Sequence, residues 1–229
     1  MSEVLENGFR VKTLFGGTVR VEKFLAEGGQ GGVYIADYNG QKKALKWYKK
    51  GSLGANPNAF YENIKQNVMR GIPSPEFLWP LDITKWVDGT FGYIMDLRPE
   101  GYYEVTEFML CHVRFKSYRA IIDAAMKIVS AFRILHNAGY SYQDLNDGNF
   151  FINPQNGKVL ICDNDNVAPD GTETGIIGKP RYMAPEIVLH KNKPNSLSDR
   201  FSMSVILYIL FCLNHPLEGK RYLVSGLTP

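Results

Sequence analysis

The stretch that decides the fold runs from residue 141 to residue 163 and reads SYQDLNDGNFFINPQNGKVLICD. Two short apolar segments, 150–153 and 158–162, flank a Pro-Gln-Asn-Gly sequence whose Asn-Gly end is typical of a hairpin turn. Asp144 and Asn149 precede the first predicted strand, and Asp163 follows the second. Because Asp and Asn also favour turns that have no function, this composition alone does not establish a site.

The spacing within this stretch is more specific than its composition. Asp144-Leu145, three further residues and Asn149 match the D-L-x-x-x-N pattern of the protein-kinase catalytic loop, and Asp163 follows where that family has its magnesium-binding aspartate. The chain therefore resembles a protein kinase. The resemblance implies that Asp144 orients and deprotonates an acceptor hydroxyl, and that Asn149 and Asp163 bind Mg²⁺.

A glycine-rich segment near the N-terminus adds to this resemblance. Residues 26–35 read AEGGQGGVYI, with four glycines between two predicted strands. Glycines let backbone amides approach a phosphate closely, although glycine-rich hairpins are also common for structural reasons alone. The family pattern G-x-G-x-x-G-x-V is matched at Gly28, Gly31 and Val33, whereas Ala26 replaces its first glycine. The resemblance implies that this segment covers the phosphates of ATP.

A third predicted strand, 41–48, contains Ala44-Leu45-Lys46, which is similar to the A-I-K of the family. The resemblance implies that Lys46 binds the α- and β-phosphates and pairs with a helix glutamate. A helix is predicted from Pro57 to about Arg70, because Asn56 is a good capping residue and Pro suits the first helical position. Glu62 is the single acid of that helix, so by elimination it is the predicted partner of Lys46.

A hairpin is predicted over 81–97, and Arg98–Gly101 is the predicted boundary between an N-terminal lobe, 1–97, and a C-terminal lobe, 98–229. The second strand of the hairpin resembles the kinase strand that enters the hinge between the lobes. The resemblance implies that Met95 lies behind the adenine ring and that backbone groups from Asp96 to Arg98 bond its edge. Three further nucleotide contacts are expected on the same basis, at Gly29, Ala44 and Phe151.

The second half of the chain continues the pattern. Residues 178–186 read GKPRYMAPE, which strongly resembles the end of a Ser/Thr-kinase activation segment. Helices are predicted from Ser117 to about Gly139 and over 201–213, and the resemblance implies that the carboxylate of Asp199 holds the catalytic-loop backbone. The expected fold class is α+β, a two-lobed protein kinase-like fold. It would have a small antiparallel sheet with one helix, then a mainly helical lobe without the family's last helices.

Several positions depart from the family pattern. Tyr142-Gln143 replaces His-Arg, so the usual pocket for an activation-loop phosphate is expected to be absent. Asn146 replaces a lysine, and Lys179 replaces the threonine that normally bonds that lysine. Because those two positions touch in the family, Lys179 is predicted to supply the missing positive charge as a catalytic residue. Asn164-Asp165 replaces Phe-Gly, which removes an apolar plug and adds a carboxylate near the metals.

Composition indicates a globular protein, with 229 residues, 45% hydrophobic and 21% charged. A net charge of +3 is too weak to indicate nucleic-acid binding. The three cysteines lie far apart in apolar surroundings and are expected to be buried thiols in a reducing compartment. Residues 1–10 lack the features of a signal peptide, and the longest apolar run, 205–213, is shorter than the ~20 residues that span a bilayer. The expected location is therefore cytoplasmic, and no association with a membrane is expected.

The expected function is transfer of the γ-phosphoryl group of ATP to a protein Ser or Thr, with Mg²⁺ as cofactor. Three alternatives remain: a pseudokinase that binds nucleotide, a small-molecule phosphotransferase of the aminoglycoside type, and a purely structural scaffold. Intact Lys46, Asp144, Asn149 and Asp163 oppose the scaffold and the pseudokinase. Asn146 and Asp165 would suit the aminoglycoside type, which normally lacks the Met-Ala-Pro-Glu segment. A partner chain or a missing C-terminal segment is expected to cover the C-terminal lobe.

Overall fold

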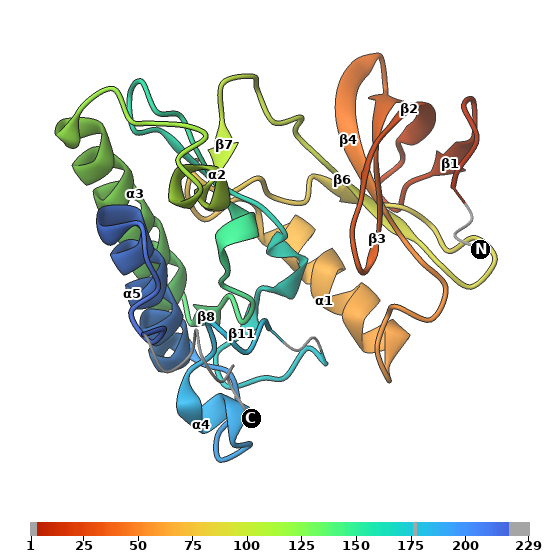
Figure 1. Ribbon diagram of the computed structural model, residues 1–229. Helices are drawn as coiled ribbons and strands as arrows, with labels where there is room; N and C mark the ends of the chain where they lie inside the picture. The colour runs from red at the N-terminus through yellow and green to blue at the C-terminus, as the bar shows by residue number, and fades with distance from the viewer. Residues whose placement is uncertain (1–3, 176–177, 220–229) are drawn as a thin grey trace. The chain divides into compact units, whose positions relative to one another are not determined.

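The computed structural model describes residues 4–175 and 178–219 (Figure 1). The chain forms two compact units, residues 1–99 and residues 100–229. The first unit is built on an antiparallel sheet with one helix, and the second contains four helices and two small sheets in its described part.

The sheet of the first unit has six strands in the order β1-β2-β3-β4-β6-β5, and all of its pairings are antiparallel. The elements of this unit are β1 (Arg10–Lys12), β2 (Thr18–Glu27), β3 (Gly31–Tyr38), β4 (Gln41–Tyr48), α1 (Pro57–Arg70), β5 (Asp82–Ile83) and β6 (Gly92–Met95). The predicted strand 41–48 is confirmed as β4, and the glycine-rich segment forms the turn between β2 and β3.

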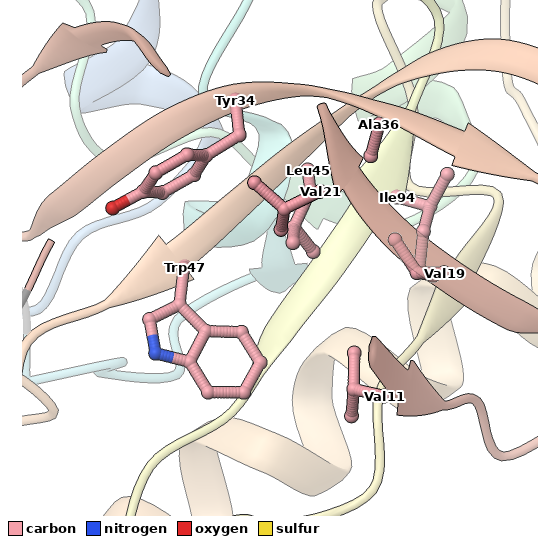
Figure 2. Close-up of a cluster of buried hydrophobic side chains, with 8 residues drawn as sticks. All are labelled: Val11, Val19, Val21, Tyr34, Ala36, Leu45, Trp47 and Ile94. Carbon is pink, nitrogen blue, oxygen red and sulfur yellow. The ribbon is translucent and has the colours of Figure 1, made fainter. Parts of the chain in front are cut away.

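The two faces of this sheet carry different side chains, since successive residues of a strand point to opposite faces. One face buries the apolar cluster shown in Figure 2, in which Leu45 and Trp47 of β4 lie with Val19 and Val21 of β2. The other face carries Lys46. Helix α1 packs on the Lys46 face, where the ring centroid of Phe60 lies 5.2 Å from that of Tyr48.

Local signals set the ends of α1 where the sequence predicts them. The side chain of Asn56 accepts a hydrogen bond from the amide of Ala59 at 3.1 Å, and Pro57 stands in the first turn. Gly71 ends the helix with a φ of 79°, which a residue with a side chain rarely adopts. The predicted helix from Pro57 to Arg70 is therefore confirmed.

The second unit is mainly helical. Its elements are β7 (Tyr103–Glu104), α2 (Val105–Met109), α3 (Tyr118–Asn137), β8 (Tyr140–Ser141), η1 (Asp147–Asn149), β9 (Phe150–Ile152), β10 (Val159–Ile161), η2 (Asn164–Asn166), β11 (Ala168–Pro169), α4 (Pro185–Val188) and α5 (Ser196–Cys212). Helices α3 and α5 pack side by side (Figure 1). The ring of Phe132 on α3 contacts the rings of Tyr142 and Phe150, which fixes the segment between β8 and β9 against this helix.

Two expectations about this unit are wrong. The helix expected over 201–213 begins at Ser196, because Asn195 and Ser198 form a reciprocal capping box; Asp199 therefore lies inside the helix. The cysteines were expected to be buried, but Cys111 and Cys212 are exposed free thiols, while Cys162 is partly buried. Cys111 lies just beyond the end of α2 and Cys212 is the last residue of α5, where less of the chain covers a side chain.

In the described part of the chain, no helix combines the length and apolar character needed to cross a membrane.

Candidate active site

The β9–β10 hairpin brings two of the predicted metal ligands together. Phe150 pairs with Ile161, and the amide of Cys162 donates to the carbonyl of Asn149 at 2.9 Å. Asn149 immediately precedes β9 and Asp163 closely follows β10, so both lie at the same end of the hairpin. The backbone of Asp163 is left-handed, with a φ of 52°, which turns the chain out of the strand direction at this point.

Asp144 lies in the loop before this hairpin and is held by two amides. Asn146 Nδ2 donates to Asp144 Oδ1 at 3.1 Å, and Asn149 Nδ2 donates to the backbone carbonyl of Asp144 at 2.9 Å. Burial raises the pKa of the Asp144 carboxyl to about 6; the bond from Asn146 and the charge of Lys179 oppose the rise, and the charges of Asp163 and Asp165 add to it. A carboxylate with a pKa near neutrality is suited to act as a general base.

The catalytic-loop backbone is anchored on α5. Asp199 Oδ2 accepts from the amide of Tyr142 at 2.6 Å and from His136 Nε2 at 3.0 Å, and Oδ1 accepts from the amide of Gln143 at 3.0 Å. The Asp199 side chain is 2% exposed, and a buried charge is tolerated when it is paired in this way. The predicted role of Asp199 is confirmed. The bond from His136 was not predicted, because the sequence places His136 only at a helix end.

The segment that follows η2 is bonded to the catalytic loop through Gln143. Gln143 Nε2 donates to the carbonyl of Thr172 at 2.6 Å, and Gln143 Oε1 accepts from Thr174 Oγ1 at 3.2 Å. The neutral amide therefore joins two parts of the chain that are distant in the sequence, where the family pattern has an arginine. Residues 176 and 177 lie outside the described residues.

Lys179 lies next to this loop. Its Nζ is 3.5 Å from Asp147 Oδ1, and a Cβ built on Gly148 would be 3.7 Å from the same Nζ. A Cβ built on the preceding Gly178 would be 3.5 Å from Asp144 Oδ1. The backbone just before Lys179 therefore passes close to the Asp144 carboxylate, and the ion pair that Lys179 forms is with Asp147.

In the first unit, the strand register places four of the predicted nucleotide contacts on one face of the sheet. Val33 pairs with Lys46, and Ala44 pairs with Met95. Lys46 is 5% exposed, and its Nζ donates to Gln30 Oε1 in the glycine-rich turn at 3.2 Å. The same ammonium lies 5.6 Å from the ring centroid of Tyr48, a cation–π distance that stabilises a buried cation.

The glycine-rich turn needs a glycine at one position. A Cβ on Gly31 would lie 2.1 Å from the carbonyl oxygen of Trp47, so any side chain would push β3 away from β4. The amide of Gly28 donates to the carbonyl of Gly31 at 2.8 Å, which closes the turn. Gly29 lies at its tip, where a Cβ would meet nothing within 4 Å. The close approach at Gly31 is a structural requirement that is separate from any role in phosphate binding.

The predicted pair between Glu62 and Lys46 is not formed. Glu62 pairs with Lys65 instead, at 2.9 Å, and its side chain is 55% exposed. The reason is the phase of the helix, since α1 buries Phe60, Tyr61 and Ile64 and turns Glu62 toward solvent.

The remaining predicted contacts are divided between the two units. Asp96 follows β6 and forms an exposed ion pair with Lys43 at 2.6 Å, while Arg98 is exposed. Phe151 is a buried residue of β9 in the second unit and pairs with Glu104 of β7.

The donor set suits magnesium. Asn149 uses its amide nitrogen to bond Asp144, which leaves the amide oxygen to act as a ligand beside the Asp163 carboxylate. Mg²⁺ prefers hard oxygen ligands and commonly takes one or two protein groups together with substrate phosphates. Among residues 4–175 and 178–219, no group of three or more His, Cys, Asp or Glu side chains could hold a metal.

A hollow of about 280 Å³ lies beside this loop in the second unit. Its lining contains small and apolar residues, Gly175, Gly178, Met183, Ile187 and Pro194. It also contains polar and charged residues, Gln143, Glu173, Thr174, His190 and Asn192. Gly178 also links the hollow to Asp144, because a Cβ on Gly178 would lie 3.5 Å from Asp144 Oδ1.

Comparisons with known proteins agree with the motifs. Residues 20–225 match the protein kinase domain family. The chain is 26% identical over 235 residues to protein kinase C delta type from Mus musculus, in an alignment that covers 95% of this chain and 34% of that protein. It is 27% identical over 195 residues to the serine/threonine-protein kinase Sgk1 from Xenopus tropicalis, where the alignment covers 81% and 45% respectively. The chain thus spans less than half of the length of these relatives.

Solved structures show the same fold. A crystal structure of the kinase domain of Mycobacterium tuberculosis PknI aligns with a TM-score of 0.68 at 18% identity, over 99% of this chain and 82% of that one. A second crystal structure of that kinase domain aligns with a TM-score of 0.67 at 18% identity, over 94% and 78%.

Proposed function

The chain belongs to the protein kinase domain family, and on this basis we propose that it transfers the γ-phosphoryl group of ATP to a Ser or Thr hydroxyl of a protein. The observation that carries the proposal is the environment of Asp144. Its carboxyl accepts a hydrogen bond from Asn146 and has a pKa raised by burial to about 6, and its backbone carbonyl accepts a hydrogen bond from Asn149. A scaffold without activity would not need a poised carboxylate at this position.

In the proposed reaction, Asp144 orients the acceptor hydroxyl and accepts its proton. The hydroxyl oxygen forms a bond to the γ-phosphorus, the bond from that phosphorus to the bridging oxygen breaks, and ADP leaves with the electron pair. Asn149 and Asp163 would hold Mg²⁺, which neutralises phosphate charge when bound. Lys179 adds positive charge near Asp144, in place of the lysine that the family has at position 146.

The first unit would bind the nucleotide. Lys46 is proposed to contact the phosphates, with Gln30 and not Glu62 holding its side chain before nucleotide binds. The backbone of Gly28, Gly29 and Gly31 is proposed to cover the phosphates. The proposed adenine contacts are Val33, Ala44, Met95, the backbone from Asp96 to Arg98, and Phe151 of the second unit.

The protein substrate and the Ser/Thr preference rest on residues 178–186, GKPRYMAPE, and on the hollow beside them. A segment of protein substrate would lie in this hollow with its hydroxyl toward Asp144. We also propose a cytoplasmic location, where ATP and thiols in the reduced state are available.

A second candidate, a nucleotide-binding module without turnover, is favoured by one observation. Glu62 pairs with Lys65 rather than with Lys46, whereas the kinase reaction requires the lysine of this strand and a helix glutamate together. An assay that separates binding from turnover distinguishes the two candidates.

The test substitutes Asp144→Asn, which keeps the shape of the side chain and removes its basicity. Transfer from radiolabelled ATP to Ser/Thr peptides should fall by ~10²–10⁴-fold, the usual contribution of a general base. The thermal shift given by Mg²⁺ and ATP should remain. Asp170→Asn is the matched control, because Asp170 bonds the amide of Ser196 and contacts none of the proposed reacting groups. A wild-type protein that binds nucleotide without any transfer would support the second candidate instead.

A further inference from the structure

Asp147 is a partly buried acid that the proposed reaction does not use. It begins the η1 turn, between Asn146 and Asn149, and its side chain is 13% exposed. Its Oδ2 accepts from Thr106 Oγ1 in α2 at 2.8 Å, and its Oδ1 accepts from the amide of Gly148 at 3.1 Å. The same Oδ1 lies 3.5 Å from Lys179 Nζ. One carboxylate therefore joins α2, the catalytic loop and the segment that carries Lys179.

The Lys179 ammonium stays in one position only if a fixed partner such as Asp147 holds it. Its side chain is 57% exposed, and a long exposed side chain samples many rotamers unless a fixed group holds it. Asp147 is itself fixed by hydrogen bonds to both oxygens, so it offers a rigid anchor. The position matters because the backbone that carries Lys179 passes close to Asp144: a Cβ on Gly178, one residue earlier, would lie 3.5 Å from Asp144 Oδ1.

Asn146 stands where the family has a lysine, and it performs one of the tasks that such a lysine could perform. Its amide bonds both the carboxylate and the carbonyl of Asp144 at 3.1 Å, and the residue is 2% exposed. It therefore orients Asp144 but carries no charge. The two tasks that one lysine could perform, orientation and charge, are divided between Asn146 and Lys179.

We propose that Asp147 is a positioning residue that holds the Lys179 ammonium beside Asp144, with Thr106 fixing the orientation of the Asp147 carboxylate. This inference rests on the proposed phosphoryl transfer, in which Lys179 supplies charge. Asp147 then affects the reaction through Lys179, and the first turn of α2 becomes part of the support of the catalytic loop. The Tyr182 side chain also interacts with the Asp147 carboxylate.

A double-mutant cycle tests this dependence. Asp147→Asn, Lys179→Met and the double variant are compared for transfer from radiolabelled ATP to a mixture of Ser/Thr peptides. Because displacing a reacting arrangement by about 1 Å can cost up to ~10²-fold, we expect Asp147→Asn to lower kcat about tenfold. The KM for ATP should not change. In the Lys179→Met background the same substitution should add less than about twofold, the usual error of additivity.

Two further variants separate positioning from folding. Asp147→Glu keeps the charge and should recover part of the lost kcat. Thr106→Val removes only the hydroxyl that fixes Oδ2, so it should lower kcat less than Asp147→Asn does. Asp170→Asn serves again as the control that leaves kcat unchanged. An equal loss of kcat in both Lys179 backgrounds would overturn the proposal and leave Asp147 a purely structural role.

A second measurement does not depend on turnover. Amine labelling of the intact protein, read by mass spectrometry, should increase at Lys179 in Asp147→Asn, while labelling of the exposed Lys193 stays constant. Unchanged labelling at Lys179 would overturn the proposal. If the wild-type protein transfers no phosphate, the proposed function fails, and the labelling still decides whether Asp147 holds Lys179.

Discussion

At the scale of single residues, His215 illustrates how a buried hydrogen-bond pair fixes a protonation state. Its Nε2 donates to the carbonyl of Arg181 at 3.0 Å, and its Nδ1 accepts from the amide of Leu217 at 3.2 Å. Nδ1 can accept only while it carries no proton, so the structure requires the neutral ring. The residue is 3% exposed, and burial lowers the pKa of His215, although the nearby charge of Glu218 opposes the shift.

This arrangement predicts a pH-dependent stability. The pKa of His215 is lower in the folded state than the ordinary value of 6.5, so the unfolded state takes up the proton first. Stability should be complete above that pH and should decline as the pH falls toward the lowered folded value. Thermal melting across this pH range should show a smaller decline in His215→Gln, which cannot be protonated. Identical pH profiles for both proteins would exclude this role of His215.

Single residues also show where sequence reasoning reaches its limit. The motif spacing predicts Asp144, Asn149 and Asp163 correctly as neighbours within one loop and hairpin, since short loops leave little freedom. From the sequence, Asn146 could be recognised only as a replacement of the lysine in the family pattern. Its bond to the Asp144 carboxylate depends on the local backbone conformation, which no residue pattern encodes.

At the scale of elements, the catalytic loop and the segment after η2 are joined by hydrogen bonds without a phosphate. Gln143 has a φ of 73°, a strained value for a residue with a side chain, and its amide bonds Thr172 and Thr174. Each such bond contributes about 1 kcal/mol to stability. The segment can therefore be held in place by neutral groups.

This link predicts activity that does not require phosphorylation. Complete dephosphorylation, verified by mass spectrometry, should leave the rate of peptide phosphorylation unchanged. Gln143→Ala should lower it several-fold, because two partners lose their bonds. Thr172→Ala should be neutral, since Gln143 bonds only its backbone carbonyl. A loss of rate on dephosphorylation that Thr172→Ala and Thr174→Ala reproduce would identify a phosphorylation switch instead.

Elements with strong local signals are the ones that the sequence predicts well. Helices α1 and α3 begin at the expected caps, Asn56 and Ser117. The predicted pairing of Glu62 is wrong because it rested on composition and ignored helix phase. At ~3.6 residues per turn, Glu62 lies about 200° around the helix from the buried Phe60. The spacing of the apolar residues in the sequence already contained this information on helix phase.

At the scale of the whole molecule, the order of motifs along the chain carries more information than any one motif. The glycine-rich turn, Lys46, the catalytic loop, Asp163, residues 178–186 and Asp199 follow one another as in the family, and residues 20–225 match it. Interactions between side chains from distant segments, such as Asp147 with Thr106 and Lys179, could not be predicted, because they depend on how packed elements meet.

The second unit leaves a row of apolar side chains exposed on α3. Tyr118, Ile122, Met126 and Val129 are three or four residues apart, so they share one side of the helix, and they are 70%, 46%, 65% and 39% exposed. At the end of this row, Tyr118 lines a hollow of about 480 Å³ together with Phe211 and Leu213. Burial of apolar surface contributes about 25 cal/mol per Å², so even a modest contact over this row would favour association.

We therefore expect the 229-residue chain to self-associate. Light scattering should show an average mass that rises with protein concentration. Ile122→Lys combined with Met126→Lys should reduce that rise without lowering the melting temperature, because neither side chain is buried in the core. Met69→Lys is the matched control, since Met69 is a similarly exposed methionine, at 61%, on α1 of the first unit. A monodisperse monomer at every concentration would mean that the row on α3 is not an association surface.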